Sequence, residues 1–209
     1  TINVGNLYLA KTQIPYRFYR FCTLDHQQQP MKSIVRFREA KGPDDFARIA
    51  RLAEIIWREH YTPIIGRAQV AYMLERFQSG EAIARQVADA TNYFLIQEGS
   101  TPVGYLAIQK RGQELFLSKV YLLREYRGLG IGKKAMDFIA EKAREYCCDR
   151  IALTVNKNND LSIKAYEKMD FENKGALVTD IGEGFVMDDY LMVNSLKNTS
   201  SDATENSPV

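Results

Sequence analysis

The order of apolar and polar positions between residues 34 and 193 is that of a mixed α/β protein. Residues 34–38 alternate apolar and charged side chains, which predicts a strand. A helix is expected to begin at Gly42-Pro43, because proline suits the first turn and the two acids that follow suit the positive end of the dipole. Thr62-Pro63 ends this helix, and shorter helices are expected at residues 70–77 and 83–87. The first helix has one apolar face at helical spacing: Phe46, Ile49, Ala53, Ile56 and Trp57.

After these helices the pattern changes to the alternation of strands. Residues 93–96, 103–108 and 115–122 each predict a strand, and the short connections between them predict an antiparallel meander. A glycine-rich turn follows, then a helix to about Tyr146 and a strand at residues 151–155. One more helix is marked by Ile163, Tyr166 and Met169, and the last two strands are expected near residues 172–177 and 185–193.

The two ends of the chain differ from this middle part. Residues 1–33 show no clean period and are expected to form an N-terminal extension outside the domain. Residues 194–209 are rich in serine, asparagine and threonine and lack apolar spacing, which predicts a disordered tail. The pattern therefore predicts one domain at residues 34–193, a length at which a single hydrophobic core is usual.

Composition excludes several classes of protein. The formal net charge is +2 and no basic stripe is present, so nucleic acid is not an expected partner. No apolar run approaches the roughly 20 residues that cross a bilayer, so no membrane contact is expected. The three cysteines lack the spacing of a disulfide framework, which favours reduced thiols and a cytoplasmic location. His26 and His60 show no ligand spacing, so no metal is expected.

The densest local signal is a glycine-rich turn between a strand and an amphipathic helix. Glycine allows a positive φ and lets a ligand approach the backbone. The first turn of the next helix has about four N–H groups without partners and a partial positive charge, so the turn predicts an anion site, above all for a pyrophosphate. A P-loop is excluded because Arg127 and Lys134 stand at two of its required positions, and the spacing GxGxG excludes the dinucleotide fingerprint. The turn comprises Arg127, Gly128, Leu129, Gly130, Ile131, Gly132, Lys133 and Lys134.

Two motifs of the chain together resemble the GNAT superfamily of N-acetyltransferases. Its coenzyme A signature is Arg or Gln, two residues, Gly, one residue, then Gly or Ala, which is matched in full by Arg127, Gly130 and Gly132. Its second motif places an Asn seven residues before a Tyr, as Asn159 and Tyr166 do. The sequence departs from the family at Asp170, where glycine is usual. Aspartate tolerates the left-handed conformation better than most residues, so the end of this helix is expected to survive.

The resemblance covers roughly residues 34–193 and implies an α/β fold with a twisted, mostly antiparallel sheet flanked by helices. Two central parallel strands, residues 115–122 and 151–155, then splay apart to admit the pantetheine arm. The resemblance implies acetyl-CoA as co-substrate, a backbone N–H near Val120 as donor to the oxyanion, and Tyr166 as the general acid for the leaving thiolate. It assigns acetyl-CoA binding to Val120, Tyr121, Leu122, Arg127, Gly128, Leu129, Gly130, Ile131, Gly132, Lys133, Asn159 and Ser162.

The acceptor and the general base are less closely defined. Residues 175–192 resemble the PaiA type of bacterial polyamine acetyltransferases, so the expected acceptor is a small primary amine, with a polyamine first among them. Two alternatives stay open: a protein or peptide N-acetyltransferase, and a non-catalytic module that binds acetyl-CoA. A homodimer is a further expectation, because dimers are common among soluble proteins. No single base is favoured among the candidate acids, which are Glu59, Glu114, Asp180, Glu183 and Asp188.

Overall fold

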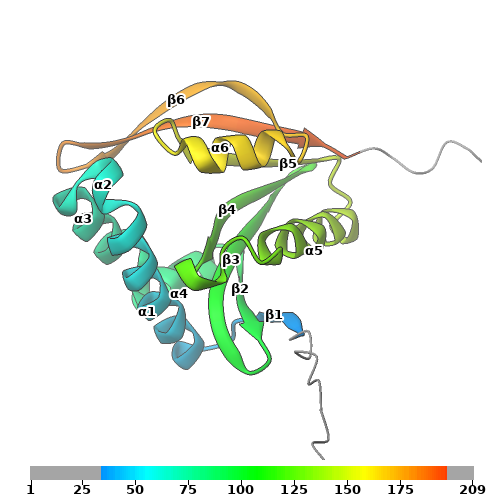
Figure 1. Ribbon diagram of the computed structural model, residues 1–209, viewed down its shortest axis with the longest axis horizontal. Coiled ribbons are helices and arrows are strands. Elements are labelled where there is room, and N and C mark those ends of the chain that lie inside the picture. The colour runs from blue at the N-terminus through cyan, green and yellow to red at the C-terminus, as the bar shows by residue number, and fades with distance from the viewer. Residues whose placement is uncertain (1–33, 197–209) are drawn as a thin grey trace, which may run out of the picture. The chain divides into compact units, whose positions relative to one another are not determined.

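The computed structural model describes residues 34–196 (Figure 1). The predicted extension at residues 1–33 and residues 197–209 of the predicted tail lie outside the described residues. The strands are β1 (Val35–Glu39), β2 (Thr91–Glu98), β3 (Thr101–Arg111), β4 (Glu114–Leu122), β5 (Arg150–Asn156), β6 (Glu172–Gly182) and β7 (Phe185–Ser195). The helices are α1 (Pro43–His60), α2 (Thr62–Ile65), α3 (Arg67–Gln78), α4 (Gly80–Ala88), α5 (Ile131–Glu145) and α6 (Asp160–Glu167), with a 3₁₀ turn at Arg124–Tyr126.

The strands form one seven-stranded sheet in the order β1-β2-β3-β4-β5-β7-β6. Every neighbouring pair is antiparallel except β4 and β5, which are parallel. The predicted fold class, a mostly antiparallel sheet with two central parallel strands, is therefore confirmed.

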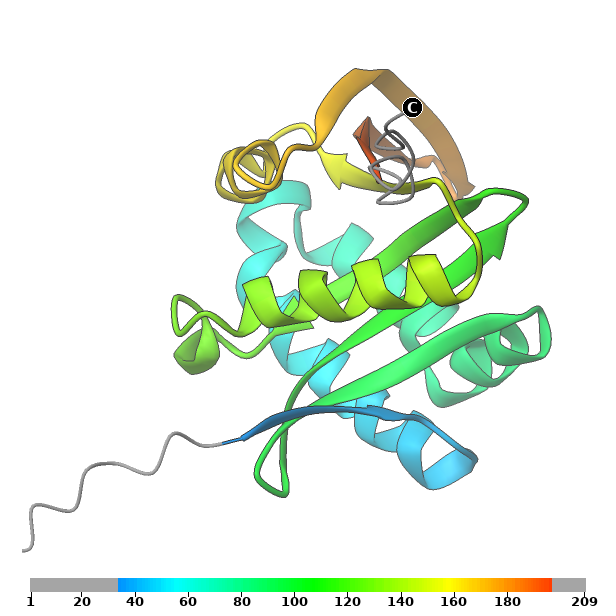
Figure 2. The same cartoon turned by 90° about the vertical axis from the view of Figure 1, so that its right-hand side faces the viewer.

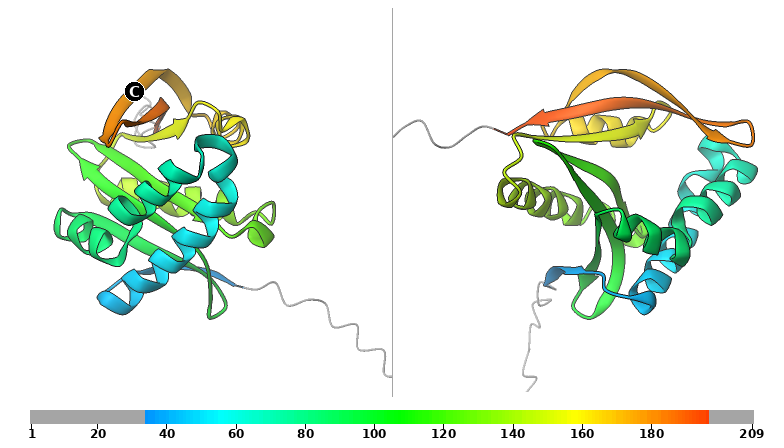
Figure 3. Two further views of the ribbon diagram at one scale, coloured as in Figure 1. Left: turned by 90° about the vertical axis from the view of Figure 1, so that its left-hand side faces the viewer. Right: turned by 180° about the vertical axis from the view of Figure 1, so that it is seen from behind.

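Helices cover both faces of the sheet. The helix α5 lies across one face (Figure 2), and α1, α3 and α4 lie against the other (Figure 3). The strand β2 shows why both faces are apolar: Phe94 and Ile96 join the core on the α5 side, whereas Tyr93 and Leu95 join the core on the α1 side. A strand buried on both faces reads as a continuous apolar run.

The pairing of β4 with β5 is short, and this splits the sheet at its centre. It runs from Glu114 opposite Arg150 to Leu117 opposite Leu153 and goes no further. On its other side β4 stays paired with β3 as far as Leu122, with a shift of register at Ser118. Such a bulge bends the strand and increases its twist. The bulge therefore marks the point at which β4 turns away from β5, as the predicted splay requires.

The observed elements depart from the predicted ones in three places. The single turn α2 follows α1 directly, although only a helix stop was predicted there. The strand β6 extends to Gly182, beyond the predicted end near Leu177, because its last residues pair with the start of β7. The strand β7 includes Ser195, so it enters the segment that was predicted to be a disordered tail. Asp170 has a φ of 62°, and the predicted left-handed conformation at this position is confirmed.

Candidate active site

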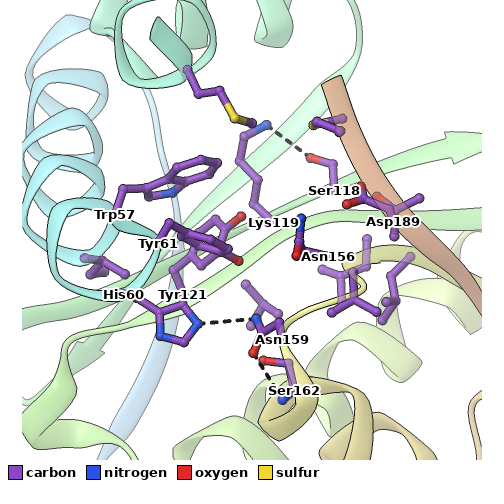
Figure 4. Close-up of a pocket in the computed structure, with 18 of the residues that line it drawn as sticks. Trp57, His60, Tyr61, Ser118, Lys119, Tyr121, Asn156, Asn159, Ser162 and Asp189 are labelled. Carbon is purple, nitrogen blue, oxygen red and sulfur yellow. Dashed lines mark hydrogen bonds between the residues drawn. The ribbon is translucent and has the colours of Figure 1, made fainter. Parts of the chain in front are cut away.

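A cavity of about 1350 Å³ runs through the split in the sheet. Its lining comes from both cores: Met136 and Met169 belong to the core on the α5 side, whereas Trp57 and Met73 belong to the core on the α1 side. The split between β4 and β5 thus joins the two faces in one continuous space. Figure 4 shows polar and aromatic side chains from α1, β4, β5, α6 and β7 around it.

At one end of the cavity lies the glycine-rich turn. Gly128 and Gly130 have φ values of 76° and 79°, and Gly130 is the N-cap of α5 with no side chain to cap it. A Cβ placed at Gly128, Gly130 or Gly132 would meet no atom within 4 Å, so the backbone here is open to a ligand. The Nε of Arg127 donates to the carbonyl oxygen of Leu122 at 3.0 Å, which holds the guanidinium at the end of β4. This arrangement has the open backbone and the positive helix end that an anion requires.

The structure places the predicted acetyl-CoA residues in two groups. Four of them do not line the cavity: Leu129, Gly130, Ile131 and Lys133. Leu129 is exposed, Ile131 is buried in the core, and Lys133 forms an ion pair with Asp137 at 3.2 Å. The residues that line the cavity are Val120, Tyr121, Leu122, Arg127, Gly128, Gly132, Asn159 and Ser162. Of these, Tyr121 directs its ring to the α1 side, whereas Val120 and Leu122 pack on the α5 side.

Asn159 has a structural function that also connects two elements. It is buried and caps α6, its Oδ1 accepting the Ser162 N–H at 3.4 Å. Its Nδ2 lies 3.3 Å from Nε2 of His60 at the end of α1. In a neutral His60 ring whose Nε2 carries no proton, this nitrogen accepts from the amide, since an amide nitrogen only donates. Burial is the largest cause that lowers the pKa of His60, which favours the neutral ring.

Tyr166 lies on α6 and lines the cavity. Its ring packs against Phe171, with the ring centroids 5.6 Å apart. Burial raises the pKa of its phenol well above the ordinary value, so the hydroxyl keeps its proton at neutral pH. The predicted donor is thus present in the protonated form that donation requires.

Aromatic rings surround the part of the cavity on the α1 side. The ring centroid of Trp57 is 4.6 Å from that of Tyr61 and 5.7 Å from that of Tyr121. Burial raises the pKa of both tyrosines, which leaves them as neutral donors. Such a wall suits the alkyl part of a small acceptor and offers it a few hydroxyl groups.

Of the acids that the sequence left open as bases, Asp180 alone lines the cavity. Glu59 pairs with Arg124 at 3.2 Å and Glu114 with Arg150 at 3.2 Å, Asp188 pairs with Lys157, and Glu183 is exposed in the turn between β6 and β7.

Sequence reasoning missed Asp189, which is buried, lines the cavity from β7 and has a pKa raised chiefly by burial. The available signal was its place in β7, in phase with Met187 and Leu191, where an apolar side chain is expected.

Lys119 extends from β4 into the α1 side of the cavity. Its Nζ donates to Oγ of Ser118 at 3.3 Å (Figure 4). It also donates to Oε1 of Gln86 at 2.8 Å and lies 5.2 Å from the ring centroid of Tyr93. Burial lowers the pKa of this amine to about 8. The sequence showed a lysine at this strand position but not that its amine faces a cavity.

Within residues 34–196, Cys147 and Cys148 are free thiols, the first exposed and the second buried. In this range no three His, Cys, Asp or Glu side chains are grouped so that they could hold a metal ion. The helices of this range are also too short or too polar to span a membrane.

Known proteins similar to this chain share its fold and part of its sequence. A thialysine N-epsilon-acetyltransferase of Mus musculus is 29% identical over 140 residues, 63% of this chain and 81% of that protein. A probable spermine N(1)-acetyltransferase of Bacillus subtilis subsp. natto is 31% identical over 64 residues, 30% of this chain and 42% of that protein. The crystal structure of the PaiA N-acetyltransferase from Thermoplasma acidophilum in complex with coenzyme A has a TM-score of 0.62 at 18% identity. It covers 78% of this chain and 99% of that one, which shows a common fold.

The model of one protein family matches residues 49–171, which is more than half of the chain. This range contains both sequence motifs, the split between β4 and β5, and the glycine-rich turn that opens α5. The activity that follows is that of an acetyl-CoA-dependent N-acetyltransferase, and the chain belongs to the acetyltransferase (GNAT) family.

Proposed function

We propose that the protein transfers the acetyl group of acetyl-CoA to the primary amine of a small aliphatic molecule. The observation that carries this proposal is the cavity, which joins an anion-binding turn on one face of the sheet to an aromatic pocket on the other. The reaction forms a bond between the amine nitrogen and the acetyl carbon and breaks the carbon–sulfur bond. The amine loses a proton and the sulfur gains one.

The β6–β7 hairpin favours a small acceptor over a protein chain. The hydroxyl of Tyr72 on α3 donates to the carbonyl oxygen of Ile181, and Nε2 of Gln69 donates to that of Val186 at 2.7 Å. The ring of Phe185 also lies 5.2 Å from that of Tyr72. These contacts fasten the hairpin to α3 across the pocket. A peptide would need an open groove at this place, whereas a small molecule needs only an entrance.

The residues present fit acetyl-CoA. In the proposed complex, the N–H groups at the start of α5 and the guanidinium of Arg127 bind the pyrophosphate, and glycine at 128 and 132 leaves room for it. The backbone of β4 beyond Ser118, which is not paired with β5, would border the arm that carries the thioester, and the N–H near Val120 would serve as the oxyanion donor. When bound, acetyl-CoA supplies an acetyl group activated as a thioester. Tyr166 donates the proton that the sulfur takes up.

Two relatives support an aliphatic amine. The names of the spermine and thialysine acetyltransferases both specify a substrate with a primary amine on a short carbon chain. Asp180 and Asp189 offer carboxylates to a cationic acceptor, which supports a polyamine as one member of this class. An alkylamine has a pKa near ~10.4 and must lose a proton before it attacks, so a carboxylate close to the amine serves both binding and deprotonation.

The test is a screen of acceptors with the full chain and acetyl-CoA. The panel contains spermidine, spermine, putrescine, cadaverine, L-lysine and a lysine-containing peptide. Release of the CoA thiol is followed, and the acetylated product is identified by mass. We expect small amines to be acetylated well above the rate of thioester hydrolysis. Acetylation of the peptide alone would refute a small acceptor, and CoA binding without thiol release on any acceptor would show a non-catalytic module.

A further inference from the structure

Lys119 is a cation in the acceptor part of the cavity without a counterion. Among residues 34–196, no carboxylate lies within ion-pair distance of its Nζ. The groups that hold it are neutral: the amide of Gln86, the hydroxyl of Ser118 and the ring of Tyr93. Lys119 is half-buried, and charges that lose part of their water in a protein are normally paired, because removal from water is unfavourable for an isolated ion. An anion bound in the cavity would supply the missing partner.

This anion is not the pyrophosphate of acetyl-CoA. Lys119 is two residues before Tyr121 on β4, so both side chains point to the α1 side of the sheet. The glycine-rich turn precedes α5, which covers the opposite face. The amine of Lys119 therefore lies on the α1 side of the cavity, where the acceptor would bind, and not at the end where the phosphates would bind.

A second cation lines the cavity. The guanidinium of Arg76, near the end of α3, is 5.9 Å from the ring centroid of Tyr72 and 6.0 Å from that of Phe77, and it is exposed to solvent. The carbonyl oxygen of Phe77 accepts from Gln86, the residue that also holds Lys119. The cavity is thus lined by two cations, Lys119 and Arg76, and by two carboxylates from β6 and β7, Asp180 and Asp189. A molecule with both an anionic and a cationic group fits this combination of charges.

We propose that Lys119, together with Arg76, binds a carboxylate of the acceptor, so that the acceptor is an amino acid acetylated on its side-chain amine. This inference rests on the proposed function, in which the thioester lies beside the backbone of β4 near the split. The reacting amine must therefore reach that point. The four-carbon stem of Lys119 carries its ammonium group away from that backbone. The carboxylate and the reacting amine are therefore separated by several bonds, as in lysine and ornithine, rather than joined to the same carbon.

Matched pairs of acceptors test this proposal. L-Lysine and cadaverine, and L-ornithine and putrescine, differ only in the carboxylate. We expect kcat/KM to be at least about 10-fold higher for the amino acid in each pair, since a hydrogen bond between charged groups typically contributes this much or more. In Lys119→Met the ratio should fall toward one, and Lys119→Arg should retain it. Because both acceptors are measured with the same variant, a general loss of activity does not change the ratio of their kcat/KM values. Lys110→Met, on the exposed end of β3, is the control and should keep the wild-type ratio.

A binding measurement supplements the kinetics. Calorimetry should show that Nε-acetyl-L-lysine binds the CoA-saturated enzyme more tightly than N-acetylcadaverine, and that Lys119→Met removes the difference. Equal kcat/KM for lysine and cadaverine in the wild type, or an unchanged ratio in Lys119→Met, would overturn the inference while small-amine acetylation stands. Failure to acetylate any small amine would overturn the proposed function and this inference with it.

Discussion

Replacement of Gly132 by alanine should weaken CoA binding while it stabilises the fold. Gly132 lies in the first turn of α5, has no left-handed φ, and would place a Cβ where no protein atom lies within 4 Å. Alanine is better than glycine in a helix by up to about 1 kcal/mol, which corresponds to a rise in Tm of up to about 2–4 °C for a domain of this size. Gly130 is unsuitable for this test, because its φ of 79° would strain any side chain.

The loss of affinity can be worked out from the same geometry. The added methyl group occupies the space through which the pyrophosphate approaches the N–H groups of α5. If it removes one hydrogen bond to a charged group, the loss is about 1.5–3 kcal/mol, or roughly 10- to 150-fold in Kd. Calorimetry with CoA measures the Kd, and thermal unfolding of the ligand-free protein measures the Tm. Gly132→Val should weaken binding further.

Gly80→Ala is the matched control for this experiment. Gly80 also stands at the start of a helix, and its Cβ would be 4.0 Å from the nearest atom, but it does not line the cavity. It should show the gain in stability without the loss of binding. A folded Gly132→Ala protein with the Kd of the wild type would refute the assignment of the pyrophosphate to this turn.

Three further predictions concern the catalytic proton, a helix cap and the ion pair of a buried aspartate with an exposed arginine. Tyr166→Phe should lower turnover ~10²- to 10⁴-fold with little change in CoA affinity or Tm, and turnover within a few-fold of the wild type would leave only a packing role. Asn159→Ala should lower the Tm by about 2–4 °C through loss of about 1 kcal/mol from the cap of α6, whereas Asn159→Asp should retain the cap; equal melting of both would contradict this. The hydrogen bond from Arg38 is the main cause that lowers the pKa of Asp45 to about 2, so its stabilisation is complete above the unfolded pKa near ~3.9 and is lost as the pH falls toward 2. Asp45→Asn should therefore lower the free energy of unfolding at pH 7, and this free energy should fall less steeply between pH 4 and pH 2 than in the wild type. Urea titrations measure it, and an equally steep fall in the variant would argue against this pair.

Much of the fold could be predicted because the apolar residues of each strand and helix recur with the spacing typical of that element. The alternation in β3 and the helical spacing in α5 are local properties, and the glycine turn between β4 and α5 is a local motif. The bulge at Ser118 could not be predicted, because it depends on the register with β3, where Ala107 faces Lys119 and Ile108 faces Leu117. Nothing in the order of residues in β4 alone specifies that shift.

The charged side chains that line the cavity could not be identified from the sequence for a related reason. A lysine or an aspartate in a strand is most often exposed, so Lys119 gave no signal as a single residue, and Asp189 gave only its place in phase with the apolar positions of β7. Gln86 comes from α4, and its contact with Lys119 exists only after α4 packs beside the sheet. The hydrogen bond between His60 and Asn159 joins residues that are 99 positions apart, and it likewise depends on the folded chain.

The split between β4 and β5 gives the protein a strand edge in its interior. Exposed edges are hazards because another chain can pair with them, but this one borders a cavity within the fold. The native state therefore has backbone N–H and C=O groups on this edge that are not paired with β5 and that a ligand can bind. By linkage, a ligand at 100 times its Kd adds about 2.7 kcal/mol to the unfolding free energy. Amide hydrogen exchange along the second half of β4 should accordingly slow when acetyl-CoA is added to the protein, because the ligand covers this edge.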